Sequence, residues 1–257
     1  LAWILVAGLG ALPFIFVGAL NPVDAYFESM SGFTTTGSSV FGESHFLNTP
    51  RGIMFWRAFT HWVGGMGIIV LFLAVLPYMG VGGKQLFKSE SPGPDPRELT
   101  PRIRDTATIL YTIYLGFTIL ETILLRAAGM NLYEALCHTF ATLATGGFST
   151  RFNSVGEFNS VSIDLIIIFF MVCAGANFGL YFALIRGNWK TLFHDTEWRV
   201  YISVLAVCTL LVALNLSGWF GASAEQGVTL VHKQYDRFTE ALRYACFQVV
   251  SIMTTTG

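Results

Sequence analysis

Three short runs of threonine and glycine contain the residue types that could bind a metal cation. Each run ends at a glycine, and Gly37, Gly147 and Gly257 follow one another at intervals of 110 residues. Threonine offers carbonyl and hydroxyl oxygens, which are hard ligands that suit an alkali cation better than a transition metal. Glycine allows backbone angles that turn carbonyl groups toward a shared centre. The runs therefore predict a cation site with nine members: Thr35, Thr36, Gly37, Thr145, Gly146, Gly147, Thr255, Thr256 and Gly257.

A short helix is predicted directly before each run, within residues 23–33, 131–143 and 235–253. A helix that ends at such a run points the negative end of its dipole there, which favours a cation. Irregular backbone at membrane depth is tolerated only inside protein or around a water-filled cavity. Three such segments therefore predict one shared cavity. The polar residues aligned within these helices are predicted to brace them rather than to bind the ion: Glu28, His138 and Gln248.

The composition is that of a membrane protein. Hydrophobic residues make up 53% of the chain and charged residues only 12%, against about 25% charged in an average soluble domain. The lipid bilayer is therefore the predicted solvent for most of the surface. The net charge of −1 gives no sign of nucleic-acid binding. The motifs of metalloproteases, nucleotide-binding enzymes and hydrolases do not occur, so no enzyme and no tightly bound cofactor is predicted.

Apolar segments long enough to cross a bilayer are predicted at residues 1–20, 51–78, 106–125, 161–185 and 200–216. The pair Asn21-Pro22 is expected to end the first of them, because proline disfavours helix in the preceding residue. Residues 40–50 and 149–160 are polar and are expected to be loops. The stretch from Gly64 to Gly67, rich in glycine, would allow close helix packing or a bend.

The predicted fold is an all-α integral membrane protein, built of repeated modules around a central pore as in potassium channels. Each module consists of a span, a short helix, a threonine–glycine loop and a second span. The predicted division is a first module at 1–79, a linker at 80–105, a second module at 106–185, a linker at 186–199 and a third module at 200–257. The third module stops at its loop and a fourth is absent, so the chain is read as a segment of a longer protein.

The distribution of basic residues predicts the orientation. Eight of them lie in the two linkers: Lys84, Lys88, Arg97, Arg102, Arg104, Arg186, Lys190 and Arg199. Positive charge is concentrated on the cytoplasmic side of membrane proteins. The linkers are therefore expected inside the cell and the three threonine–glycine loops outside.

The runs themselves resemble the filter loops of the Trk/Ktr/HKT superfamily of potassium transporters, with the nearest likeness in the bacterial TrkH branch. The likeness rests on residues 33–38, 144–150 and 247–257 and on 175–180 after the second run. It implies four linked modules around one pore, a selectivity filter for potassium as the transported ion, and one key glycine per module, which here are Gly37, Gly147 and Gly257. It also implies a homodimer in the bacterial inner membrane with a cytosolic nucleotide-binding regulatory subunit of TrkA type.

Several polar residues leave alternatives open. Glu121 lies inside a predicted span and is either a proton-coupling group or a neutral or locally paired structural residue. Asn177 is either part of a gate or a hydrogen-bonding contact between helices. Arg57 and His61 lie one helical turn apart and either set the potential at the pore mouth or anchor helices to one another. The rival function is an alternating-access cation symporter coupled to protons or sodium. Modules with an even number of spans all enter from the same side, which favours the pore.

Overall fold

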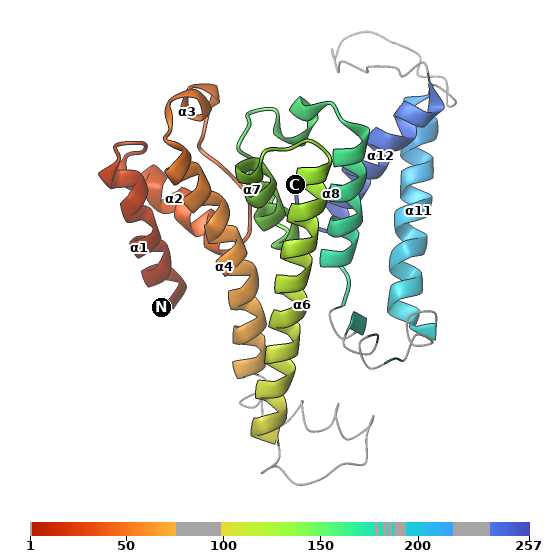
Figure 1. Ribbon diagram of the computed structural model, residues 1–257, viewed down its shortest axis with the longest axis horizontal. Helices are drawn as coiled ribbons and strands as arrows, with labels where there is room; N and C mark the ends of the chain where they lie inside the picture. Colours follow the sequence, from red (N-terminus) through yellow and green to blue (C-terminus); the bar gives the residue numbers. More distant parts are fainter. Residues whose placement is uncertain are drawn as a thin grey trace.

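The computed structural model describes residues 2–75, 99–177, 194–217 and 237–257, together with positions 180, 181, 184 and 187. Within these ranges the fold is all-helical, as predicted (Figure 1). Its helices are α1 (Ala2–Phe16), α2 (Pro22–Phe33), α3 (Glu43–Asn48), α4 (Arg51–Val75), α6 (Leu99–Ala127), α7 (Leu132–Leu143), the 3₁₀ helix η2 (Ser154–Phe158), α8 (Val161–Ala174), α11 (Thr196–Leu216) and α12 (Phe238–Met253).

The short helices predicted before the three runs are α2, α7 and α12, of 12, 12 and 16 residues (Figure 1). Helix α2 packs against α1 and α4, α7 against α4, α6 and α8, and α12 against α8 and α11. The aligned residues Ala25, Ala135 and Ala245, one in each short helix, are completely buried. A methyl side chain at this position lets each short helix approach its neighbours closely. Helices α4 and α8 each contact the short helix before them and the next one along the chain.

The prediction that Asn21-Pro22 ends the first helix is wrong. Helix α1 ends at Phe16, and Pro22 is the first residue of α2. The side chain of Asn21 accepts hydrogen bonds from the backbone N–H groups of Val23 and Asp24 at 3.1 and 3.0 Å. Proline is tolerated at a first helical position because no intrahelical partner exists for its missing N–H. The pair is thus a helix start, and Asn131 caps α7 in the same way, accepting from the N–H of Glu134 at 2.8 Å.

Other predicted boundaries also shift. The expected loop at 40–50 contains α3, and the expected loop at 149–160 contains η2. Helix α6 begins at Leu99, so the end of the predicted linker at 80–105 is helical. Helix α11 begins at Thr196 because Asp195 caps it, accepting from the N–H of Trp198 at 2.7 Å.

The helix within the fourth predicted span, at 161–185, also ends earlier than expected. Helix α8 ends at Ala174, and Gly175 is its C-cap residue. Residues 76–98 and most of 178–193 lie outside the described part of the chain. So do the linker residues Lys84, Lys88, Arg97, Arg186 and Lys190.

Two of the described helices are long and apolar enough to cross a membrane, at Thr108–Ala127 and Thr196–Leu216. Only 33% and 17% of these segments are buried inside the protein. The core helix of a soluble protein would be mostly covered by its neighbours. These two helices instead expose apolar side chains, including Leu115, Ile119 and Leu210.

Candidate ion-binding site

The three short helices end in the same backbone motif. We call the segments that follow them the first loop (34–38), the second loop (144–148) and the third loop (254–257). The N–H of Thr36 donates to the carbonyl of Ser31, that of Gly146 to Ala141 and that of Thr256 to Ser251, each at 2.9 Å. A second bond one residue earlier completes a Schellman motif at each end. The residues predicted to form the cation site therefore share one backbone geometry.

The residue in the left-handed position of this motif is a threonine in all three loops. The φ angles of Thr35, Thr145 and Thr255 are 54°, 53° and 58°. Glycine normally fills this position, because a left-handed conformation costs an L-residue roughly 1–2 kcal/mol. For a β-branched residue it is a genuine outlier. Strain that recurs at three equivalent positions is typical of a functional site.

The glycine two residues later also adopts a left-handed conformation, with φ angles of 77°, 77° and 84° at Gly37, Gly147 and Gly257. A Cβ atom on Gly37 would collide with the carbonyl oxygen of Gly146. One on Gly147 would collide with that of Thr256. The loops therefore lie in contact in chain order, the first against the second and the second against the third. The structure brings the predicted site residues together in these three adjoining loops.

Two threonine hydroxyls in the first loop, and two in the third, are hydrogen-bonded to each other. The hydroxyls of Thr34 and Thr36 lie 2.8 Å apart, as do those of Thr254 and Thr256. Thr34 also donates to the carbonyl of Met30 and Thr254 to that of Val250. These bonds make backbone carbonyls the better cation ligands. Thr34 and Thr254 are supporting residues that the sequence prediction missed, although each directly precedes a predicted site residue.

A serine after each of the first two loops ties the loop back to its helix. Ser39 donates to Glu28 at 2.9 Å, and the Ser149 hydroxyl lies 3.1 Å from Nε2 of His138. Both serines also accept a backbone N–H two residues on, at 3.0 Å. Glu28 and His138 thus brace the helices, as predicted. Gln248, the third aligned residue, is exposed.

Helix α4 lies against the C-terminal end of α2 and against the second loop. A Cβ atom on Gly64 would collide with the carbonyl of Phe33, and one on Gly65 would approach Ala144 within 3.1 Å. Gly175, 110 residues after Gly65, has the same relation to Thr254 of the third loop. The glycine-rich stretch of α4 therefore provides close packing, and the helix runs without a break from Arg51 to Val75.

Arg57 anchors α4 to its surroundings from a buried position. It forms an ion pair with Glu28 and donates to the carbonyl of Ser149 at 3.0 Å. Anchoring is thus the interpretation that the geometry favours. A second ion pair, nearer the surface, joins Arg151 to Glu134 at 2.8 Å. The hydrogen bond to Glu134 raises the pKa of Arg151 above its already high value.

Glu121 and Asn177 belong to other segments than the three loops. Glu121 is completely buried in α6, and its carboxylate oxygens have no hydrogen-bond partner among the described residues. The adjacent Thr122 donates to Thr139 of α7 at 3.2 Å, so this part of α6 packs on the second short helix. Asn177 follows the end of α8 and donates to Glu197 at 3.3 Å. It lines a cavity of about 310 Å³ that also reaches Met253.

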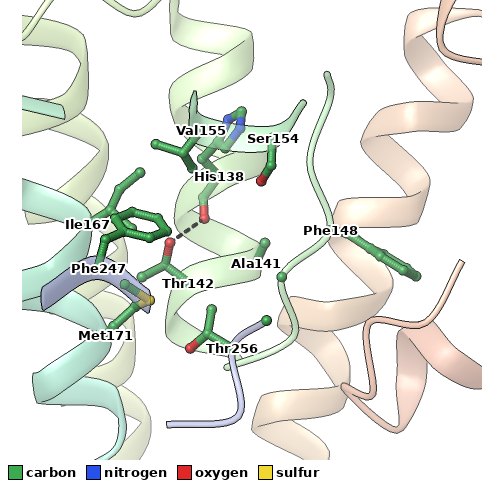
Figure 2. A pocket seen from close by; sticks show the side chains of 12 residues that line it. His138, Ala141, Thr142, Phe148, Ser154, Val155, Ile167, Met171, Phe247 and Thr256 are labelled. Carbon is green, nitrogen blue, oxygen red and sulfur yellow. Dashed lines mark hydrogen bonds between the residues drawn. The ribbon is translucent and has the colours of Figure 1, made fainter. Parts of the chain in front are cut away.

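A smaller pocket lies where the second and third loops meet (Figure 2). Its walls come from α7, α8 and η2, with Thr256 and Gly257 of the third loop on one side. Thr142 lines it and donates to the carbonyl of His138 at 2.8 Å. No group of three or more acidic, histidine or cysteine side chains that could hold a metal occurs in the described ranges.

Comparison with known proteins identifies the family. The family model described as "TrkH: Cation transport protein" matches residues 2–257. This chain belongs to the TrkH family. The resemblance read from the threonine–glycine runs is therefore correct.

Named relatives and a solved structure agree. The chain is 43% identical to the Trk system potassium uptake protein TrkH of Salmonella typhimurium, covering 100% of this chain and 51% of the relative. It is 34% identical to the Trk system potassium uptake protein TrkI of Halomonas elongata, covering 100% and 49%.

The crystal structure of the potassium transporter TrkH from Vibrio parahaemolyticus superposes with a TM-score of 0.81 at 36% identity, covering 99% of this chain and 49% of that one. The chain thus spans about half the length of these relatives.

Proposed function

We propose that this chain forms the first three pore modules of a potassium uptake subunit, with the three loops as its selectivity filter. The observation that carries the proposal is the repeated geometry at the loops: a left-handed threonine, a left-handed glycine and direct contact between successive loops. The names of the relatives, which are potassium uptake proteins, support potassium as the ion.

The chemistry follows from the backbone. Carbonyl oxygens arranged around an axis replace the water shell of a dehydrated potassium ion. The C-terminal ends of α2, α7 and α12 lead into the loops and add the negative ends of their dipoles. Gly37 and Gly147 leave no room for a side chain beside the neighbouring carbonyl. A filter of this kind is proposed at Thr35, Thr36, Gly37, Thr145, Gly146, Gly147, Thr255, Thr256 and Gly257.

The architecture proposed around this filter is that of repeated modules in a bilayer. The modules occupy residues 1–79, 106–185 and 200–257, and the longer relatives supply the length for a fourth. The loops face the outside and the linkers the cytoplasm of a bacterial inner membrane. The partners proposed for the full-length protein are a second copy of itself and a cytosolic nucleotide-binding regulator of TrkA type.

One observation favours a second candidate, a symporter in which uptake is coupled to protons. Glu121 is a completely buried carboxyl group without a hydrogen-bond partner among the described residues. An ionisable group buried in a spanning helix is a functional candidate by default. In the pore mechanism the same residue has only a packing role against the second short helix. Asn177, beside the cavity near Met253, is proposed to take part in gating.

The test is rubidium uptake into proteoliposomes that contain the full-length parent protein. Competition by potassium but not sodium, with uptake driven by an imposed voltage alone, is expected for a selective pore. A requirement for a proton or sodium gradient would support the coupled carrier, with Glu121 as the candidate coupling residue. Absence of uptake under every gradient would refute both.

A further inference from the structure

One side chain of helix α4 joins the first loop to the second. The guanidinium of Arg57 pairs with Glu28, whose carboxylate also accepts from Ser39 and from the backbone N–H of Val40 just after the first loop. The same guanidinium donates to the carbonyl of Ser149, just after the second loop. Arg57 is only 3% exposed. It therefore bridges two loops whose anchoring residues lie far apart in the sequence.

Phe148, the residue after Gly147, receives two further contacts from α4. The Arg57 guanidinium lies 3.5 Å from the centre of its ring. The His61 ring stacks on it with centroids 3.9 Å apart and planes 20° apart. In Figure 2 the Phe148 side chain points away from the pocket toward the pale orange helix α4. A cation and an aromatic ring from one helix thus hold the residue that follows the filter glycine.

His61 also touches the second loop itself. A Cβ atom on Gly146 would collide with three atoms of the His61 ring. The ring is completely buried, and its nitrogens have no hydrogen-bond partner in the part of the chain that the structure describes. The His61 ring therefore contacts one face of the second loop by van der Waals packing and not by hydrogen bonds. The carbonyl of Gly146 is the same group that meets Gly37 of the first loop.

The next interface lacks these residues. At the positions 110 residues after Arg57 and His61, helix α8 carries Ile167 and Met171. Both are buried and line the pocket beside Thr256 and Gly257 of the third loop (Figure 2). Neither side chain can donate a hydrogen bond or carry charge. At these two aligned positions the first interface thus carries an arginine and a histidine, and the second carries apolar side chains. The ion pair that joins α8 to α12, Asp164 with Arg243 at 3.6 Å, uses other positions.

We propose that Arg57 and His61 are positioning residues that determine ion specificity by fixing the second filter loop against the first. This inference rests on the proposed function of the loops as a potassium filter. Selectivity requires carbonyl groups held at defined positions, and a displacement of Gly146 or Gly147 would change the spacing between adjoining carbonyls.

The test uses the full-length parent protein in proteoliposomes and measures rubidium uptake with sodium or potassium as competitor. The double variant Glu28→Gln/Arg57→Met removes the link between loops and leaves no unpaired buried charge, which a single change would do. The glutamine amide can still donate to Ser39 and accept from Val40. The variant His61→Met places at this interface the residue found at the second one. Ile167→Leu is the matched apolar control.

The double variant is expected to lower potassium over sodium discrimination by about tenfold, the effect of losing one hydrogen bond to a charged group. His61→Met removes the ring stacked on Phe148 and is expected to lower it by about threefold, the effect of losing one aromatic pair. Both variants should give the same yield of folded protein as the parent. Ile167→Leu should keep the parent ratio. The inference is overturned if His61→Met and the double variant keep full discrimination, or if Ile167→Leu loses as much. If the double variant does not fold, His61→Met and Arg57→Lys test the inference instead. Lysine keeps the positive charge but lacks the planar guanidinium that donates to Glu28 and to the Ser149 carbonyl together.

A separate variant, Gly147→Ser, distinguishes failure of this inference from failure of the filter assignment. Altered selectivity in Gly147→Ser together with unaltered selectivity in the α4 variants would retain the filter and overturn the inference. Unaltered selectivity in all of them would overturn both.

Discussion

The carbonyl oxygen of Gly146 occupies the space that a side chain on Gly37 would need. Gly37 also has a φ angle of +77°, which a residue with a side chain adopts only under strain. Two independent constraints, one local and one from the neighbouring loop, thus require glycine at this position. The same pair of constraints applies to Gly147 and the carbonyl of Thr256.

Gly37→Ser and Gly147→Ser should each raise sodium permeation of the full-length protein. The added Cβ atom must push the adjoining loop away, which widens the distance between carbonyls and weakens the match to potassium. The measurement is sodium competition against rubidium uptake. Gly116→Ala is the control, because nothing lies within 4 Å of a Cβ atom there and alanine favours the helix. Unchanged preference for potassium in both serine variants would refute the filter assignment.

Thr145→Gly should leave the protein as stable as the parent, or up to about 1 kcal/mol more stable. Glycine removes a left-handed penalty of roughly 1–2 kcal/mol but adds entropy to the unfolded chain. Discrimination between potassium and sodium should fall, because the loop becomes freer. Denaturant unfolding in detergent and competition assays measure the two effects. Thr145→Ala keeps a Cβ atom and should show no such gain. A clear loss of stability in Thr145→Gly would contradict strain at this position.

Gly64→Ala should destabilise the protein by about 1–3 kcal/mol, the usual cost of overpacking a well-packed contact. Its methyl group would strike the carbonyl of Phe33, which belongs to the backbone and cannot rotate away. Gly67→Ala, one turn further along α4, is the control. The nearest atom there is a carbon of the Trp3 side chain at 3.9 Å, an ordinary contact. Equal melting temperatures for the two variants would argue against close packing at Gly64.

Glu121→Gln should leave the stability of the protein unchanged or higher. A buried carboxyl group without a hydrogen-bond partner is costly, and the amide keeps the shape of the side chain. If transport is passive, voltage-driven rubidium uptake should equal that of the parent. Glu121→Leu serves as a control for shape and packing. Loss of proton-driven uptake in Glu121→Gln, with the folded protein intact, would instead show that the carboxyl group takes part in coupling.

The sequence alone was sufficient to place the three loops and the helices before them. A repeat of 110 residues aligns Gly37, Gly147 and Gly257, and hydropathy outlines the spans. Both signals are local or periodic, so they need no knowledge of packing. Helix boundaries were less predictable. Asn21-Pro22 can end one helix or begin the next, and the choice depends on whether the Asn21 side chain finds free N–H groups, as it does at Val23 and Asp24.

The tertiary structure decided which residues hold the loops together. Arg57 and Ser149 are 92 positions apart, and no repeat or hydropathy pattern pairs them. Whether Arg57 faced solvent at a pore mouth or an acid inside the protein depended on the packing of α4 between α2 and α7. Sequence patterns report the preference of each segment for helix, lipid or water. The contacts between segments arise only when the helices pack. Packing places Gly64 against the carbonyl of Phe33 and Arg57 beside Glu28.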